Sequence, residues 1–283
     1  MTLSPAPVEI IAAHSPDSDD AFMFYGLATK KVRSSKVSFR HVLEDIETLN
    51  RKAREGLYGL SAVSYHAYAY VADKYVLMAS GSSIGDGYGP MIISSRPMEP
   101  DEIKGKRIAV PGTMTTSYLA CRLCQPDFEA IVTPFDKITD AVRERYVDAG
   151  LIIHEAQLTY EKAGFHRVVD LGRWFKTVHG LPLPLGANVL LRSLDPEIKA
   201  ECCRLMRESI QYALDNHDEA LQYAMQFARD MDTELADQFV GMYVNKWTLG
   251  YGEKGKRAVQ ELVTRGTRAG IIPGPDTVEF LSE

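Results

Sequence analysis

Short apolar runs alternate with longer amphipathic stretches over the first two thirds of the chain. The runs are rich in Val, Ile, Leu and Ala and end at polar or turn residues, a pattern typical of buried strands. The expected strands are 8–13, 37–43, 60–63, 75–79, 88–94, 107–110, 130–133, 151–153, 168–171 and 187–191. Helical segments lie between most of them, and this alternation predicts an α/β protein.

The pattern changes after Asp195-Pro196. From there we expect consecutive amphipathic helices at 197–216, 218–229, 232–244 and 253–269. Two earlier stretches interrupt the pattern, and the second of them is expected to be a loop. The segment 181–186 contains two prolines and cannot be a continuous helix. The segment 81–89 contains four glycines, with a spacing too irregular for a phosphate-binding fingerprint.

Length and charge narrow the function classes. A chain of 283 residues has a length typical of roughly two domains, and a second α/β unit is expected to begin near 96–100. The net charge of -6, with Lys and Arg spread along the chain, argues against a nucleic-acid partner. No apolar run approaches the ~18 residues of a membrane span. The first residues lack a basic and apolar leader, so we expect a cytoplasmic protein.

Cysteines and aspartates raise the question of a metal site. Cys121 and Cys124 form a C-x-x-C, but the adjacent pair 202–203 supplies no second one, so packing is favoured over zinc. The segment 17–20 contains three aspartates without the Gly and distal Glu of a calcium loop. Ser18, Asp19 and Asp20 are therefore interpreted as the start of a helix, and no metal is expected.

The apolar run 151–153 ends on His154 and Glu155. An imidazole at the carboxyl end of a buried strand lies where open α/β sheets bind ligands. Its ordinary pKa near 6.5 lets histidine take and return a proton at neutral pH. A structural histidine at the following turn is the alternative. In extended geometry Glu155 would point to the opposite side, so it is not expected to orient His154.

Three strand-to-helix turns contain hydroxyl side chains, at Ser15, at Ser64 and at Thr115 with Thr116. Free N–H groups and the positive end of the helix dipole make such turns natural anion sites. Simple N-capping would explain any one of them. Three such turns from two α/β units favour a cleft for an anionic, oxygen-rich small molecule, which His154 would share.

Longer motifs make the comparison specific. The chain resembles the 1,4-dihydroxy-6-naphthoate synthases, which act on cyclic dehypoxanthinylfutalosine in the futalosine route to menaquinone. The matching motifs run in order along nearly the whole chain and are found at 15–16, 20–22, 43–51, 64–65, 67–69, 109–112, 115–116, 149–155, 168–172, 180–186, 243–245 and 252–253.

This resemblance implies a two-lobed periplasmic-binding-protein-like fold of type II, with a helical C-terminal segment. Residues 1–92 with 188–283 would form the first lobe and 93–187 the second. The activity implied is that of a carbon–carbon lyase without a cofactor, acting on a small-molecule carboxylate. The family's catalytic base falls on His154. Its substrate contacts fall on Ala62, Val63 and Ser64 and on Thr115 and Thr116, with Asn50 and Ser15 as weaker correspondences.

Two positions depart from the family pattern. Ala62 stands where some relatives have a long polar side chain, and 16–20 reads Pro-Asp-Ser-Asp-Asp where many have Pro-Cys-Pro-Asn-Asp. Both lie by the expected ligand and bear on which close analogue is bound. Two other functions share the fold. One is a non-catalytic solute-binding protein, and the other is the sister enzyme chorismate dehydratase.

Overall fold

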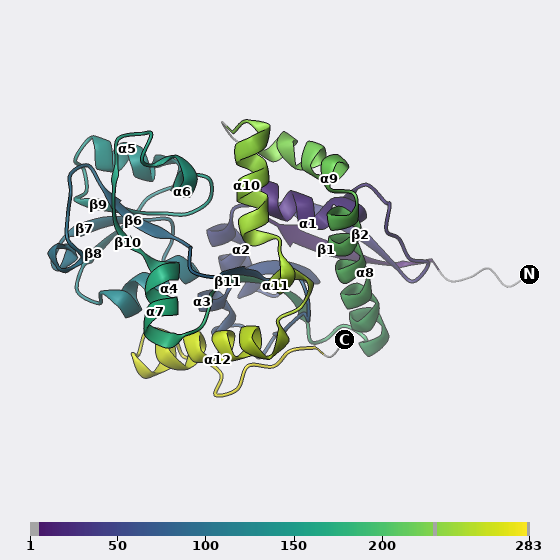
Figure 1. Ribbon diagram of the computed structural model, residues 1–283. Coiled ribbons are helices and arrows are strands. Elements are labelled where there is room, and N and C mark those ends of the chain that lie inside the picture. The colour runs from purple at the N-terminus through teal and green to yellow at the C-terminus, as the bar shows by residue number, and fades with distance from the viewer. Residues whose placement is uncertain (1–5, 229–230, 282–283) are drawn as a thin grey trace, which may run out of the picture.

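The computed structural model describes residues 6–228 and 231–281 and places their strands in two sheets (Figure 1). The first sheet has the order β2-β1-β3-β11-β4, and β5 pairs with β11. Its strands are β1 (Val8–His14), β2 (Val37–Leu43), β3 (Leu60–Ser64), β4 (Tyr75–Leu77), β5 (Ser83–Gly85) and β11 (Leu183–Leu191). We call this sheet, with the helices packed on it, the first half.

The second sheet has the order β10-β6-β9-β7-β8 and forms, with its helices, the second half. Its strands are β6 (Met91–Ser94), β7 (Arg107–Val110), β8 (Glu129–Val132), β9 (Ala149–Ile152) and β10 (His166–Asp170). The predicted strand at 151–153 corresponds to β9, which runs parallel to β7 and antiparallel to β6. The two sheets and their helices confirm the α/β class.

Parallel pairing determines where the turns gather. In the first half β1 runs parallel to β2 and to β3, and in the second half β7 runs parallel to β8 and β9. Parallel strands have their carboxyl ends at one edge of the sheet, where ligands bind in open α/β folds. The turns after β1, β3, β7 and β9 therefore bring Ser15, Ser64, Thr115 and His154 to such edges.

Helices cover both sheets. In the first half α1 packs against α8, α9 and α10, with Phe22, Phe24 and Met206 buried among them. In the second half α5 packs on β9, and α4 packs on α7. The helices not yet bounded, including short 3₁₀ turns η1–η3, are α1 (Ser18–Ala28), α2 (Ile46–Ala53), α3 (Tyr65–Tyr68), η1 (Pro100–Ile103), α4 (Thr116–Cys124), η2 (Phe135–Lys137), α5 (Ile138–Arg143), α6 (Ala156–Thr159), α7 (Leu171–His179), α8 (Pro196–Asp215), α9 (His217–Ala224), η3 (Met225–Phe227), α10 (Thr233–Tyr243), α11 (Lys246–Leu249) and α12 (Gly252–Arg268).

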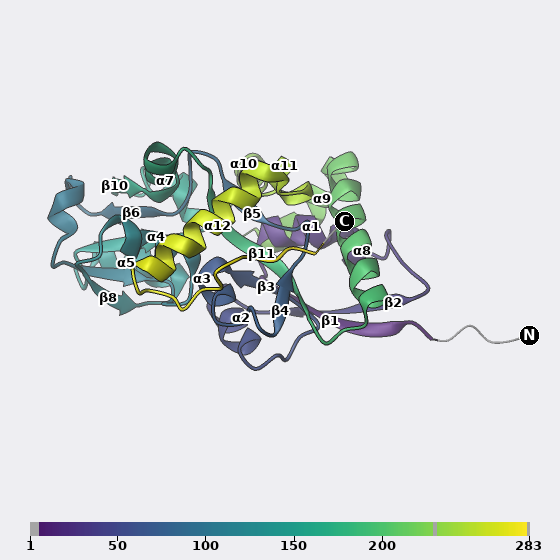
Figure 2. The ribbon, with the colours of Figure 1, turned by 90° about the horizontal axis from the view of Figure 1, so that it is seen from below.

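Helix α12 joins the two halves. It contacts β11 and α3 of the first half and α4 of the second, and Figure 2 shows it running from one half to the other. One hydrophobic cluster includes Tyr65 of α3, Leu119 of α4 and Leu262 of α12, all fully buried. At Gly266 an added Cβ would lie 3.0 Å from Leu119 Cδ1 and closer still to Ile272, so the helix has little free space at this point. The two sheets therefore share a continuous apolar core.

Several predicted boundaries were wrong. The strand expected at 187–191 begins at Leu183, because Pro184 lies in an extended strand whose pairing with β5 is irregular between Pro184 and Gly186. The glycine-rich loop 81–89 contains β5. The strand expected at 88–94 begins only at Met91, after Gly89-Pro90. The helix expected at 218–229 ends at Ala224 and continues as η3, and Arg229 lies outside the described residues.

Within residues 6–228 and 231–281, no helix combines the length and the apolar character needed to span a bilayer.

Candidate active site

A cavity lies between the two halves, lined by residues from both. It encloses about 770 Å³ of empty space, counting the part open to solvent. The predicted site residues found in its wall are Ser15, Ala62, Val63, Ser64, Thr115, Thr116 and His154. The segments proposed from separate turns of the sequence therefore converge on one site. Whether these side chains contact a substrate stays a prediction.

One side of the cavity is made of hydroxyl groups at helix starts. Thr115 is the N-cap of α4, and its Oγ1 accepts a 3.2 Å hydrogen bond from the N–H of Tyr118. Thr116 Oγ1 accepts a 2.8 Å hydrogen bond from the backbone N–H of Tyr65 and donates to the carbonyl of Leu185. Thr116 thus ties the start of α4 in the second half to the first half. The positive end of the α4 dipole makes this side favourable for a carboxylate.

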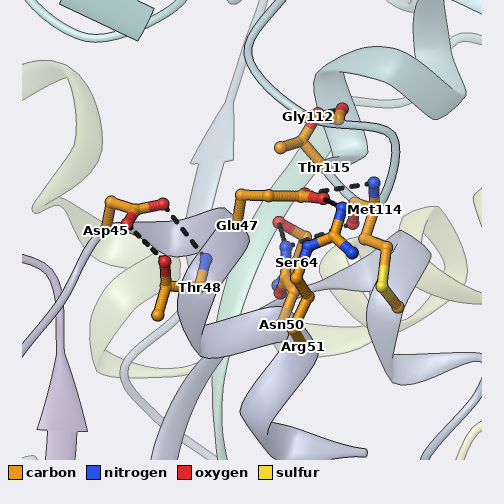
Figure 3. Close-up of polar contacts among 9 residues, drawn as sticks. All are labelled: Asp45, Glu47, Thr48, Asn50, Arg51, Ser64, Gly112, Met114 and Thr115. Carbon is orange, nitrogen blue, oxygen red and sulfur yellow. Dashed lines mark hydrogen bonds and ion pairs between the residues drawn. The ribbon is translucent and has the colours of Figure 1, made fainter. Parts of the chain in front are cut away.

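Asn50 is the one predicted site residue that lies behind the wall. It is fully buried on α2, where its Nδ2 donates to Ser64 Oγ at 3.0 Å and to the carbonyl of Met114 at 3.2 Å. Its Oδ1 accepts from the N–H of Ser64 at 2.8 Å. These contacts are drawn in Figure 3. Since Ser64 Oγ accepts from Asn50, the hydroxyl proton of Ser64 remains available for a ligand.

A second contact from α2 reaches the loop before α4. Glu47 accepts a 3.2 Å hydrogen bond from the N–H of Met114. It also forms a 2.9 Å ion pair with Arg51 on its own helix (Figure 3). Burial raises the pKa of Glu47. A Cβ added at Gly112 would lie 2.3 Å from Glu47 Oε2, so only glycine permits this approach. Residues Glu47 and Asn50 therefore hold the 112–114 loop, and with it Thr115, against the first half.

His154 lines the cavity from the turn between β9 and α6. Its backbone has φ 58°, a left-handed conformation uncommon for a residue with a side chain. The ring packs edge-on against Phe135 with centroids 4.9 Å apart, and the side chain is 17% exposed. The turn also ends the extended geometry assumed for Glu155, which instead precedes the first turn of α6. The ring of His154 is thus held in place yet accessible from the cavity.

The side of the cavity near His154 is acidic. Asp17, Asp19 and Asp20 all line it. The predicted helix start at 18–20 is confirmed, with Asp19 and Asp20 in the first turn of α1, but these residues are not its caps: the N-cap is Asp17, whose side chain makes no capping hydrogen bond. Asp20 instead accepts a 2.7 Å hydrogen bond from the N–H of Ser15. The carboxylates face the cavity because Ser15 and Pro16 turn the chain there before α1 begins.

Burial sets the protonation of two of these carboxyl groups. It is the main cause that raises the pKa of Asp20 to about 7, with the charge of Asp17 adding to it and the Ser15 N–H opposing it. Burial and the charges of Asp20 and Asp17 likewise raise the pKa of Asp19. Neighbouring carboxylates in a low-dielectric site cannot all ionise easily. The site therefore offers carboxylic acid as well as carboxylate groups near neutral pH.

Two further cavity residues join the halves near His154. The hydroxyl of Tyr243 on α10 donates a 2.8 Å hydrogen bond to Gln157 Oε1 on α6. Gln157 Nε2 in turn donates to the carbonyl of His154 at 3.1 Å. Asn188 also lines the cavity; its Nδ2 donates to the carbonyl of Gly81, while its Oδ1 is buried without a partner among the described residues. A buried acceptor of this kind suits a ligand hydroxyl.

Metal ligation finds no support in the described part of the chain. No group of three or more His, Cys, Asp or Glu side chains there could hold a metal ion. The four cysteines are free thiols, and burial raises the pKa of Cys124 to about 11 and that of Cys202 to about 12. Cys121 packs in the apolar cluster shared by the halves.

Comparison with known proteins decides the family. A family model described as menaquinone biosynthesis matches residues 10–268. The chain belongs to this menaquinone biosynthesis family. Two curated relatives are named 1,4-dihydroxy-6-naphthoate synthase. The protein from Thermus thermophilus is 40% identical over 262 residues, 92% of this chain and 95% of the relative. The protein from Streptomyces coelicolor is 37% identical over 276 residues, 95% of this chain and 97% of the relative.

Solved structures confirm the fold. A crystal structure of a protein from Archaeoglobus fulgidus is 46% identical in sequence and superposes with a TM-score of 0.90. The match covers 93% of the present chain and 98% of the Archaeoglobus chain. The alkanesulfonate-binding protein of Xanthomonas axonopodis is 9% identical with a TM-score of 0.70, covering 97% of each chain. The aliphatic sulphonate-binding protein of Escherichia coli, a periplasmic protein, has a TM-score of 0.65 at 12% identity. The predicted periplasmic-binding-protein-like fold is therefore confirmed for this menaquinone biosynthesis protein.

Proposed function

We propose that this protein is a 1,4-dihydroxy-6-naphthoate synthase that converts cyclic dehypoxanthinylfutalosine to 1,4-dihydroxy-6-naphthoate, with His154 as the general base. The observation that carries the proposal is the position of His154, in a cavity that it shares with Ser64, Thr115 and Thr116. The names of the two curated relatives support the same activity. We propose a cytoplasmic location on the same ground, since those relatives are named as biosynthetic enzymes.

The two sides of the cavity suggest how the substrate is oriented. Its carboxylate would lie at the hydroxyl side, where Ser64, Thr115 and the start of α4 favour an anion. The hydroxyl-bearing, sugar-derived part would lie toward Asp19, Asp20 and the unpartnered Asn188 Oδ1, which accept hydrogen bonds. The opposite arrangement would bring the substrate carboxylate against the acidic side, where like charges repel.

In the proposed reaction His154 removes a carbon-bound proton that a neighbouring carbonyl group makes acidic. Hydroxyl and backbone N–H groups stabilise the resulting enolate. Cleavage of a carbon–carbon bond then expels the sugar-derived fragment, and formation of the aromatic naphthoate ring makes the step favourable. A positioned base contributes about 10²- to 10⁴-fold to the rate, and proton removal by an imidazole involves no cofactor.

The test is incubation of the protein with the cyclic substrate and detection of the naphthoate product. His154→Ala is expected to bind substrate but to lose about 10²- to 10⁴-fold in kcat. His166→Ala, on the exposed surface of β10, is the matched control and should turn over like the wild type. Turnover by H154A within a few-fold of the wild type would contradict the role of His154.

Two rival functions are measured in the same experiment. A solute-binding protein would bind the substrate without forming product. A chorismate dehydratase, the sister enzyme with the same fold, would consume chorismate instead. Assays of both substrates side by side separate the three outcomes.

A further inference from the structure

A carboxylate from the first half faces the imidazole from the second half. Asp17 Oδ2 lies 3.5 Å from His154 Nδ1, and the two side chains are 8% and 17% exposed. Asp17 precedes α1 and His154 follows β9. In the sequence, 136 residues lie between them. The carboxylate and the ring meet only because the two halves lie against each other at the cavity.

The carboxylate of Asp17 is held in position by its own loop. Ser15 Oγ donates a short hydrogen bond to Asp17 Oδ2, the same oxygen that faces His154. The backbone carbonyl of Asp17 accepts a 2.9 Å hydrogen bond from the N–H of Ala21 in the first turn of α1. The N–H of Ser15 is in turn bound by Asp20. A carboxylate fixed on both its side-chain and backbone atoms presents a constant direction to its neighbour.

The imidazole of His154 is also restrained. Phe135 packs against the ring at an interplanar angle of 71°. The carbonyl of His154 accepts hydrogen bonds from the N–H and from the Nε2 of Gln157, each 3.1 Å long, and Gln157 is held by Tyr243. These contacts hold the left-handed turn, in which Nδ1 lies 3.5 Å from Asp17 Oδ2. A base whose partner and backbone are both fixed is the arrangement expected for proton abstraction.

We propose that Asp17 is a positioning residue for His154, accepting the Nδ1–H of the neutral ring. This rests on the proposed function, in which His154 is the general base. With the proton held on Nδ1, the lone pair is on Nε2, the nitrogen that remains for the substrate. A carboxylate that fixes the tautomer of a catalytic histidine is known from the Ser-His-Asp arrangement. The 3.5 Å separation shortens to a hydrogen bond when substrate is bound, as catalytic contacts commonly do.

The other acidic groups near the ring do not serve this role. Glu155 follows His154 directly, but it lies outside the cavity lining. Asp20 lines the cavity, yet its Oδ2 accepts from the N–H of Ser15. Asp19 also lines the cavity, and no ion pair joins it to His154 among the described contacts, whereas Asp17 lies within ion-pair distance.

The proposal is tested with Asp17→Asn, which keeps the shape of the side chain and can donate to Nδ1 instead of accepting from it. We expect kcat to fall by about 10²-fold or more, because the ring is held in the wrong tautomer, while the dissociation constant for substrate changes less than threefold. Nitrogen-15 NMR of the histidine ring at pH 8–9, with H154A used for assignment, should show Nδ1–H in the wild type and Nε2–H in D17N. Asp73→Asn, an exposed turn residue, is the matched control.

The outcomes separate this proposal from the one on which it rests. If H154A keeps its turnover, the general-base role fails. If H154A is inactive while D17N keeps kcat within threefold and His154 keeps Nδ1–H, the role of Asp17 is overturned. A purely structural role would lower stability without changing the tautomer. If D17N does not fold, the same two measurements on D17A decide, with a mixed tautomer and reduced kcat expected.

Discussion

The hydroxyl of Tyr243 donates a 2.8 Å hydrogen bond to Gln157 Oε1 and so joins α10 of the first half to α6 of the second. Both side chains line the cavity, and Gln157 also binds the carbonyl of His154. Burial raises the pKa of Tyr243, so the phenol stays a donor throughout the neutral range. This bond therefore stabilises the arrangement of the halves in which the cavity is complete.

Replacing Tyr243 by Phe should weaken ligand binding. The variant keeps the ring but loses one neutral hydrogen bond, which contributes about 0.5–1.5 kcal/mol. We expect the dissociation constant for 1,4-dihydroxy-6-naphthoate to rise about 2- to 12-fold by isothermal titration calorimetry. Tyr146→Phe, on an exposed side chain, is the control. Equal affinities of Y243F and the wild type would show that this bond does not contribute to the bound arrangement.

Gly112 and Glu47 should be coupled. Gly112→Ala places a Cβ 2.3 Å from Glu47 Oε2, so Glu47 must move and lose the N–H of Met114. We expect kcat/KM to fall about 10-fold or more, the effect of a charge-assisted hydrogen bond of about 1.5–3 kcal/mol. In a Glu47→Ala background the same glycine substitution should cost little, and a double-mutant cycle measures the difference. Gly241→Ala has no atom within 4 Å of its new Cβ and is the control. Additive effects of G112A and E47A would contradict the coupling.

Asp20 should make the folded state less stable as the pH rises. Burial raises its pKa from 3.8 to about 7, so the folded protein binds this proton more tightly than the unfolded chain. The stabilisation of the folded state by this bound proton is complete below pH ~4 and is lost as the pH rises through about 7. Asp20→Asn removes this dependence and keeps an acceptor for Ser15. Urea unfolding at pH 5 and at pH 8 gives the free energy of unfolding of both proteins. We expect the difference between D20N and the wild type to shift in favour of D20N by about 1 kcal/mol or more from pH 5 to pH 8. A constant difference between the proteins would refute the assignment, and Asp73→Asn is the control.

Local patterns predicted much of the fold. The strand 37–43 matches β2 residue for residue, because Val37 and Phe39 alternate with Ser38 and Arg40 in the pattern of a half-buried strand. The turns at Ser64, Thr115 and His154 all lie at one cavity, because parallel strands bring their carboxyl ends to one edge. The start of β11 was missed because prolines normally argue against a strand, and irregular pairing with β5 accommodates Pro184.

The rest of the site depends on contacts between distant segments. Tyr243 and Gln157 are 86 residues apart, and neither stands in a motif that indicates a cavity residue. Asp17 reads as a helix-start residue, because an aspartate before an apolar helix is most often a cap. Only the packing of the halves turns it toward His154. Asn50 was placed near the cleft by resemblance, and its actual place behind Ser64 follows from the packing of α2 on β3.

The position of α12 constrains how the protein is made. This helix follows β1 to β11 in the described part of the chain, yet its apolar side chains complete the core that both sheets share. During synthesis the two sheets can form while α12 is still within the ribosome, but their shared core stays open until residues up to Arg268 have emerged. A ribosome-bound chain that ends before Gly252 would therefore contain every cavity residue named above. The apolar core shared by the two sheets would still be partly exposed to water in that chain.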